Sequence, residues 1–179
     1  MNKSFYLAAT ILATVFLLPG CAIHVQTRVD RQADFSRYKT FCWMEGCEFK
    51  ISGPSHLIQD SILRENVKKS IINELKNRGI FQDDNNPDLL IAFTITIKDE
   101  ESIVYRHSDE NPFYYKMDME PKVYRYLKGS MVIAMADKKE SKIVWESLSE
   151  SYFELNPDMS EKNIAKGIRL ALKNFPPKN

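Results

Sequence analysis

The chain has 179 residues, of which 44% are hydrophobic, and it carries 25 Lys and Arg residues against 24 Asp and Glu residues. This length suits one domain of ordinary size with a buried core. The formal net charge of +1 argues against a protein that holds nucleic acid on a basic surface, and it predicts no strong attraction to anionic membranes.

The N-terminal segment has the pattern of a bacterial export signal. Lys3 precedes an uncharged apolar run from Phe5 to Leu18, which is too short to cross a bilayer comfortably. The run Leu17–Cys21 resembles a lipobox, the signal at which the cysteine is lipidated and the segment before it is removed. We therefore predict a cleaved signal peptide over residues 1–20 and lipidation at Cys21. The alternatives are a plain secretory signal, which more often ends in Ala-x-Ala, and an uncleaved anchor, which usually needs about 20 apolar residues.

A lipidated Cys21 would attach the domain to a membrane without spanning it. Bacterial lipoproteins typically carry three acyl chains, and each buried methylene contributes roughly 0.8 kcal/mol. Ala22 stands where lipoproteins retained in the inner membrane commonly have Asp, so the sequence predicts an outer-membrane lipoprotein that faces the periplasm. Removal of the first 20 of 179 residues leaves a single periplasmic domain, residues 21–179. Lys3 is the only charged residue that is lost, so 24 basic residues then balance 24 acidic ones.

Two β segments are expected next. Hydrophobic or β-prone residues alternate with polar ones from Ile23 to Val29, as in a strand. A turn over residues 34–38 leads into a second β-prone segment, residues 38–43. Cys42 and Cys47 flank four residues that include Gly46. In an oxidising compartment this spacing predicts a structural disulfide across a small loop, with two free thiols as the alternative. A metal site would need about four ligands, and no His or second Cys pair is nearby; a redox pair would more often have two intervening residues.

The clearest helix begins near Ser55 or Asp60 and ends at Arg78. Its apolar residues recur every four positions, at Leu63, Val67, Ile71 and Leu75, which is the spacing of one helix face. Gly79 stands where a left-handed C-cap belongs. The acidic run 83–88 fails the EF-hand template at its sixth and twelfth positions, so a polar turn is expected there.

Residues 89–97 alternate strictly and predict the strongest strand. Further strands near residues 123–136 and 142–150 are joined by a polar turn, residues 137–141, which is short enough for a hairpin. A last helix follows residues 156–158, with Asp158 or Ser160 as its N-cap. Its expected buried face comprises Ile164, Ile168, Ala171, Leu172 and Phe175. We predict an α+β fold, a two-layer sandwich with a mostly antiparallel sheet and two helices packed on one face.

Five segments in this order resemble a family of bacterial lipoproteins that is known as a domain of unknown function, number 4136. The segments are 34–41 followed by Trp43, 86–91, 129–133, 143–145 and 175–177. Each is weak alone, and their order makes the resemblance fairly specific over nearly the whole mature chain. The family has no assigned catalytic residues. The resemblance implies a small envelope lipoprotein that works as an assembly or accessory subunit.

The sequence gives no sign of catalysis. His24, His56 and His107 are far apart, and none stands at metal-ligand spacing from a Cys or carboxylate. Nucleophile elbows, phosphate loops and zinc-protease helices are missing from the sequence. We therefore expect no enzyme, no cofactor and no metal.

Two surfaces are candidates for binding. The stretch 98–128 mixes charge with aromatic residues that interfaces favour, namely Tyr105, Phe113, Tyr114, Tyr115, Tyr124 and Tyr126; the alternative is a long hairpin or loop whose aromatics fold back onto the domain. The second is the sheet face turned away from the helices, with Leu90 and Ala92, and with Val132, Ala134, Val144 and Leu148 if the register allows. The leading hypothesis is a non-catalytic binding or structural role with an envelope protein partner and no nucleic acid. The alternative is a carrier of a lipid or another apolar ligand.

Overall fold

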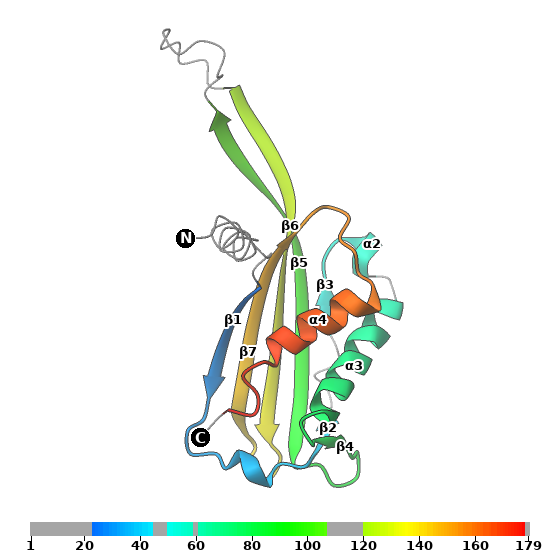
Figure 1. Cartoon of the computed structure of the whole chain (residues 1–179), viewed down its shortest axis with the longest axis vertical. Helices are drawn as coiled ribbons and strands as arrows, with labels where there is room; N and C mark the ends of the chain where they lie inside the picture. The colour runs from blue at the N-terminus through cyan, green and yellow to red at the C-terminus, as the bar shows by residue number, and fades with distance from the viewer. Residues whose placement is uncertain (1–22, 45–49, 59–60, 107–119, 178–179) are drawn as a thin grey trace, which may run out of the picture.

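The computed structural model of the chain describes residues 23–44, 50–58, 61–106 and 120–177. Within these residues an open seven-stranded sheet lies against two helices of more than one turn, α3 (Ser61–Lys76) and α4 (Glu161–Ala171), as Figure 1 shows. The strands follow the order β1-β7-β6-β5-β2-β4, and β3 also pairs with β5. Three pairings are antiparallel and three are parallel. The predicted α+β class is therefore confirmed, with a mixed sheet.

Four strands form the antiparallel part of the sheet. They are β1 (His24–Val29), β7 (Lys142–Phe153), β6 (Glu120–Asp137) and β5 (Leu89–Arg106). The sequence predicted all four, β1 and β5 from their alternation, although β5, β6 and β7 are longer than expected. The β6–β7 hairpin turns where the polar run predicted it. The Asp137 carboxylate accepts the backbone N–H of Glu140 at 2.9 Å, and Ser141 has a φ of 52°.

Three short strands form the parallel part. They are β2 (Thr40–Trp43), β3 (Lys50–Ser52) and β4 (Phe81–Gln82). β2 and β3 both run parallel to β5, and β2 also runs parallel to β4. Parallel neighbours need a crossover connection, and α3 supplies it between β2 and β5. The sequence predicted β2 but not β3 or β4.

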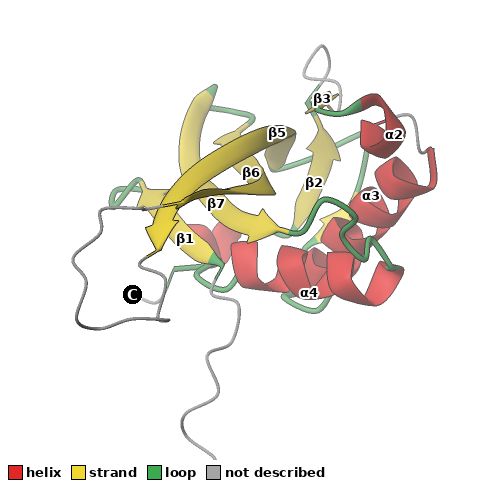
Figure 2. Cartoon of the chain, turned by 90° about the horizontal axis from the view of Figure 1, so that it is seen from above, coloured by secondary structure: helices red, strands yellow, loops and turns green. Residues whose placement is uncertain are grey.

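The helices begin and end close to the predicted residues. α2 (Ser55–Ile58) and α3 (Ser61–Lys76) begin near the two predicted start residues, Ser55 and Asp60. Gly79 has a φ of 79°, which confirms the left-handed C-cap, because glycine adopts this conformation without a Cβ clash. Ser160 is the N-cap of α4. Figure 2 shows α3 and α4 side by side along the sheet.

One hydrophobic core joins the sheet and both helices. Leu63, Val67, Ile71 and Leu75 of α3 belong to it, together with alternate residues of β5 and the end of α4. Trp145 of β7 is wholly buried, and its ring centroid lies 5.1 Å from that of Phe175. Full burial of a large apolar side chain contributes about 1.5–3 kcal/mol.

Val144 also belongs to the core, at 1% exposure. The sequence analysis placed this side chain on the opposite face of the sheet, on the condition that the register allowed it. A register shift between Met135 and Ala136 changes the alternation at this point, because a bulge inserts an extra residue into one strand. The other residues named for that face are half-buried.

A buried carboxylate holds the C-terminal ends of α3 and α4 together. Glu74 Oε2 accepts a hydrogen bond from Arg78 Nη1 at 2.5 Å, and Glu74 Oε1 accepts one from Arg169 Nε at 2.9 Å. Arg78 also donates to the carbonyl of Phe175 at 2.7 Å and to that of Leu172 at 3.2 Å. Because one guanidinium bonds both segments, the loss of Arg78 should loosen the whole C-terminal end.

β5 and β6 continue beyond the helices as a two-stranded arm, residues 98–106 and 120–128, which Figure 1 shows projecting from the rest of the domain. The described pairing ends at Arg106 and Glu120. Ile103 and Val123 face each other across the arm, and each is 57% exposed. The antiparallel pairing of these strands agrees with the hairpin alternative for this stretch, and the folding back of its aromatics stays a prediction.

Candidate ligand-binding groove

An apolar groove opens between the sheet and the N-terminal halves of α3 and α4. It has a volume of about 170 Å³ and is lined mostly by apolar atoms. α3 contributes Leu63 and Val67, and α4 contributes Ile164, Gly167 and Ile168. Met159 in the loop before α4 covers one end. The same groove is therefore bordered by both helices and the sheet.

The floor of the groove combines large apolar residues with three small ones, Gly129, Ser149 and Ser151. Ile97, Gly129 and Ser151 form one row across three strands, and Ile95, Met131 and Ser149 form the next. A Cβ added at Gly129 would lie 2.6 Å from Cε2 of Phe153, so the phenyl ring lies directly over this glycine. Gly129, Ser149 and Ser151 fill less of this region than the residues beside them, and the groove keeps space that a well-packed interior would normally fill.

The wall on the α4 side is also open. A Cβ added at Gly167 would meet no atom within 4 Å. Glycine in a helix interior is about 0.8–1.0 kcal/mol less favourable than alanine. The helix therefore carries an unfavourable residue at a position where a methyl group would have room, and that position borders the groove.

Two serines of β7 differ in how their hydroxyls are satisfied. Ser147 is fully buried, and its Oγ donates to the carbonyl of Ala171 in α4 at 2.9 Å. Ser149 is 5% exposed and lines the groove, but its Oγ has no hydrogen-bond partner. An unpaired buried hydroxyl costs about 1–3 kcal/mol. A ligand that accepts a hydrogen bond from Ser149 would remove this cost.

The chain reaches the groove directly from its N-terminal side. Ile23, the first described residue, lines the groove. It precedes His24, which pairs with Glu150 of β7. Glu150 lies at the rim and bonds Lys128 Nζ at 3.0 Å. The residue just before β1 thus adds an apolar side to the groove.

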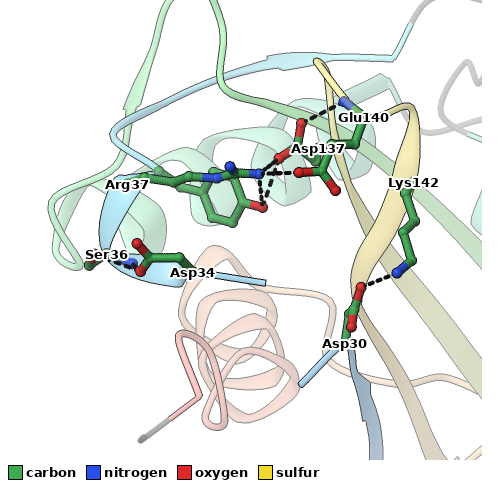
Figure 3. Close-up of polar contacts among 8 residues, drawn as sticks. Asp30, Asp34, Ser36, Arg37, Asp137, Glu140 and Lys142 are labelled. Atoms are coloured by element: carbon green, nitrogen blue, oxygen red, sulfur yellow. Dashed lines mark hydrogen bonds and ion pairs between the residues drawn. The ribbon is translucent and has the colours of Figure 1, made fainter. Parts of the chain in front are cut away.

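A polar cluster lies near the β6–β7 turn, and Figure 3 shows its contacts. The carboxylate of Asp137 accepts hydrogen bonds from Arg37 Nη2 and, at 2.9 Å, from the Tyr38 hydroxyl. Arg37 also bonds Glu140 at 3.0 Å. Burial alone would raise the pKa of Asp137, but the Glu140 N–H, the Tyr38 hydroxyl and the Arg37 guanidinium together lower it.

This cluster borders a polar cleft of about 530 Å³ that Asp88 also lines. Asp88 accepts the backbone N–H groups of Lys39 and Thr40 at 2.7 and 3.0 Å. Burial would raise the pKa of Asp88, yet these donors lower it. The cleft is larger than the groove, but its carboxylates are already hydrogen-bonded. The hydrogen bonds around this cleft therefore connect β2, the start of β5 and the β6–β7 turn.

The predicted aromatic surface is only partly described. Phe113, Tyr114 and Tyr115 lie outside the described residues, and only the backbone of Tyr105 is described, paired with Pro121. Tyr124 is 44% exposed on the arm. The ring of Tyr126 lies 5.5 Å from that of Tyr152 of β7, so this tyrosine packs against the sheet, whereas Tyr124 faces solvent.

Cys21 and Cys47 also lie outside the described residues. Cys42 is half-buried in β2 and pairs in register with Leu90, so the disulfide stays a prediction. Within the described ranges, no helix is both long and apolar enough to cross a membrane. In the same ranges, no three His, Cys, Asp or Glu side chains gather as metal ligands would.

Sequence reasoning missed the groove altogether. Its floor depends on Gly129, Ser149 and Ser151, and its wall on Gly167. One signal could have pointed there: serines alternate at 147, 149 and 151 in a strand, and a glycine interrupts the apolar face of the last helix. Small residues on facing elements leave room between them.

These features define a small mixed α+β domain with an apolar groove between its layers. The chain belongs to the DUF4136 family, described as "Domain of unknown function (DUF4136)", because the family model matches residues 25–177. The resemblance found in the sequence is thereby confirmed.

Solved structures are similar to this chain at low sequence identity. A PDZ domain protein from Parabacteroides distasonis ATCC 8503 is 17% identical with a TM-score of 0.54; the match covers 87% of this chain but 36% of that one, so this chain spans about a third of its length. A DUF4136 family protein from Bacteroides thetaiotaomicron VPI-5482 is 17% identical with a TM-score of 0.50, over 86% of this chain and 96% of that one. The PelC dodecamer from Paraburkholderia phytofirmans is 10% identical with a TM-score of 0.48, over 88% and 100%. No curated protein matches.

Proposed function

We propose that the protein is a lipoprotein tethered by Cys21 to the outer membrane, with its single domain, residues 21–179, in the periplasm. The lipobox-like run before Cys21 supports the tether, and Ala22 supports the outer membrane. Radiolabelled palmitate should appear on the wild-type polypeptide and not on Cys21→Ser. If the two proteins fractionate alike and neither takes up label, the tether is wrong.

The proposal includes the arrangement of the layers. The domain is a two-layer sandwich in which α3 and α4 cover one face of a sheet that is antiparallel along its longest strands. Two observations support this: a single core contains residues of both helices, and the buried hydroxyl of Ser147 in β7 bonds the carbonyl of Ala171 in α4.

The role that the geometry supports best is non-catalytic binding of an apolar chain. The observation that carries it is the groove itself, whose lining is mostly apolar and whose floor includes the small residues Gly129, Ser149 and Ser151. Pockets for drug-sized ligands typically measure about 300–1,000 Å³, and this one measures about 170 Å³. The groove therefore has room for part of one acyl chain and not for several chains.

The chain contains its own probes for this proposal. Met131 and Met159 line the groove, whereas Met135 is fully buried in the core. Cells that express the full chain with photo-methionine, a diazirine analogue of methionine, can be irradiated and the adducts mapped by mass spectrometry. We expect acyl-chain adducts at Met131 and Met159, and none at Met135.

A matched pair of variants tests whether the adducts depend on the open groove. Gly167→Leu places an isobutyl group in the free space beside α4, while Lys166→Leu adds the same group to the neighbouring exposed position. Filling the groove should abolish the adducts, and the Lys166 variant should keep them. Equal labelling of both variants would contradict an acyl-binding groove.

A second role, contact with an envelope protein partner, is supported by the arm. Ile103, Val123 and Tyr124 expose apolar surface on two strands that project from the domain, and exposed apolar patches commonly mark interaction sites. A photo-crosslinking residue at Tyr124 should capture a protein in intact cells, whereas one at the exposed Lys173 of the opposite end should not. Identical patterns at both positions would remove the arm from consideration.

A further inference from the structure

The N-terminus of the described chain enters the groove that is proposed to bind an acyl chain. Ile23 lines the groove, and it stands beside the row of Ser151 and Gly129 that forms the outer part of the floor. The segment that precedes Ile23 is therefore connected to the mouth of the groove, not to a distant part of the domain.

Only Ala22 separates Ile23 from Cys21. Two Cα-to-Cα steps span at most about 7 Å, so any lipid attached to Cys21 begins within that distance of a groove residue. A group tied by so short a linker has a local concentration in the millimolar range or above. An acyl chain on Cys21 thus competes for the groove with an advantage that a freely diffusing ligand lacks.

The sizes of the groove and of the anchor are compatible with each other. Stable membrane attachment takes about two hydrophobic anchors, while one acyl chain alone holds only weakly. A cysteine with three acyl chains can therefore place one chain in the groove and keep two in the bilayer. The volume of about 170 Å³ admits part of one chain and excludes a second.

The chemistry of the groove suits the start of such a chain. Acyl chains on a lipoprotein cysteine begin at ester or amide carbonyls, which accept hydrogen bonds. Ser149 is 5% exposed, and its hydroxyl has no hydrogen-bond partner. It lies in the floor row next to the row of Ser151. The remaining lining offers apolar contact to the methylenes.

From these observations we infer that one of the acyl chains carried by Cys21 binds in the groove. The inference rests on the proposed lipidation and on the proposed acyl binding. It names the occupant as part of this same molecule. It also gives the tether a second role, because the seated chain holds the groove side of the domain against the membrane.

The photo-methionine experiment on the full chain in cells distinguishes the sources of the chain. After irradiation and proteolysis, an adduct at Met159 or Met131 that also contains the Cys21 peptide shows that the captured chain is the protein's own. An adduct with the mass of a free phospholipid overturns this inference and leaves the proposed groove binding intact. Palmitate labelling without any groove adduct overturns both.

A longer linker gives an independent test. Insertion of about 20 glycine and serine residues between Ala22 and Ile23 should reduce the Cys21-linked adducts on the order of tenfold, because effective concentration falls with linker length. Palmitate labelling should stay unchanged in this variant. Cys21-linked adducts that persist at the wild-type level would contradict seating through the short tether, as would their persistence in Gly167→Leu.

Discussion

Gly167 provides the most direct test of whether the space beside α4 is empty. Gly167→Ala replaces the least favourable non-proline helix residue with the most favourable one, a gain of about 0.8–1.0 kcal/mol in a helix interior. The added Cβ would meet no atom within 4 Å, so no steric penalty offsets this gain. For a domain of this size we expect the melting temperature to rise by about 2–4 °C.

The measurement is thermal and urea unfolding of the Cys21→Ser protein, which carries no acyl chain that could occupy the groove, followed by tryptophan fluorescence, to which the buried Trp145 contributes. Lys166→Ala is the control, since Lys166 is exposed on the same helix and surface changes usually stay within about 0.5 kcal/mol. A Gly167→Ala protein that is less stable than the wild type would mean that the space is occupied, and the groove would then be misplaced. If it is more stable and also loses acyl-chain adducts, the glycine is retained for binding rather than for folding.

Three further predictions concern packing and charge. Gly129→Ala should destabilise the domain by about 1–3 kcal/mol because its Cβ displaces the Phe153 ring, and in a double-mutant cycle this loss should largely vanish in a Phe153→Ala background. Arg78→Met should cost about 3 kcal/mol because it leaves the buried carboxylate of Glu74 short of a partner, whereas Arg169→Met, at a side chain that is 70% exposed, should cost at most about 1 kcal/mol. Burial raises the pKa of Glu74, but Arg169 and Arg78 together lower it below its value in the unfolded chain. The carboxylate therefore contributes stability that is fully present above the unfolded pKa and is lost as the pH falls through the folded pKa. Unfolding midpoints measured downward from about pH 5 should fall steeply in the wild type and less steeply in Glu74→Gln; parallel curves would refute this assignment.

The parts of the fold that could be predicted are those with a long, regular pattern. α3 and the first half of β5 repeat their apolar residues over several periods. Gly79 was predictable as a C-cap because glycine adopts the left-handed conformation without a Cβ clash. β3 has three residues and β4 has two, which is too few to show an alternating pattern. Their place is determined by pairing with β5 and β2, which is a tertiary property that local sequence does not carry.

The groove could not be predicted because its parts come from distant segments. Ile23, Gly129, Ser149 and Gly167 lie in four different segments and meet only through the sheet register and the position of α4. The serines of β7 also mislead a pattern analysis, because polar residues on alternate positions usually mark the solvent face. Here that face is buried: Ser147, Ser149 and their neighbour Trp145 point toward the core.

The contacts that α3 and α4 make differ along the two helices. At the C-terminal ends, Glu74 and Arg78 tie α3 to the last residues of α4 through charged hydrogen bonds with every partner in place. Nearer the start of α4, Lys69 and Glu161 are joined at 2.8 Å by an exposed ion pair, which contributes little. Between Glu161 and Arg169, α4 carries Gly167 beside the groove, whose floor holds the unpaired Ser149 hydroxyl. Open space and an unpaired polar group therefore coincide at the groove. Such local departures from good packing are expected where a protein binds something, and this one is lined by Ile23, two residues after the proposed anchor Cys21.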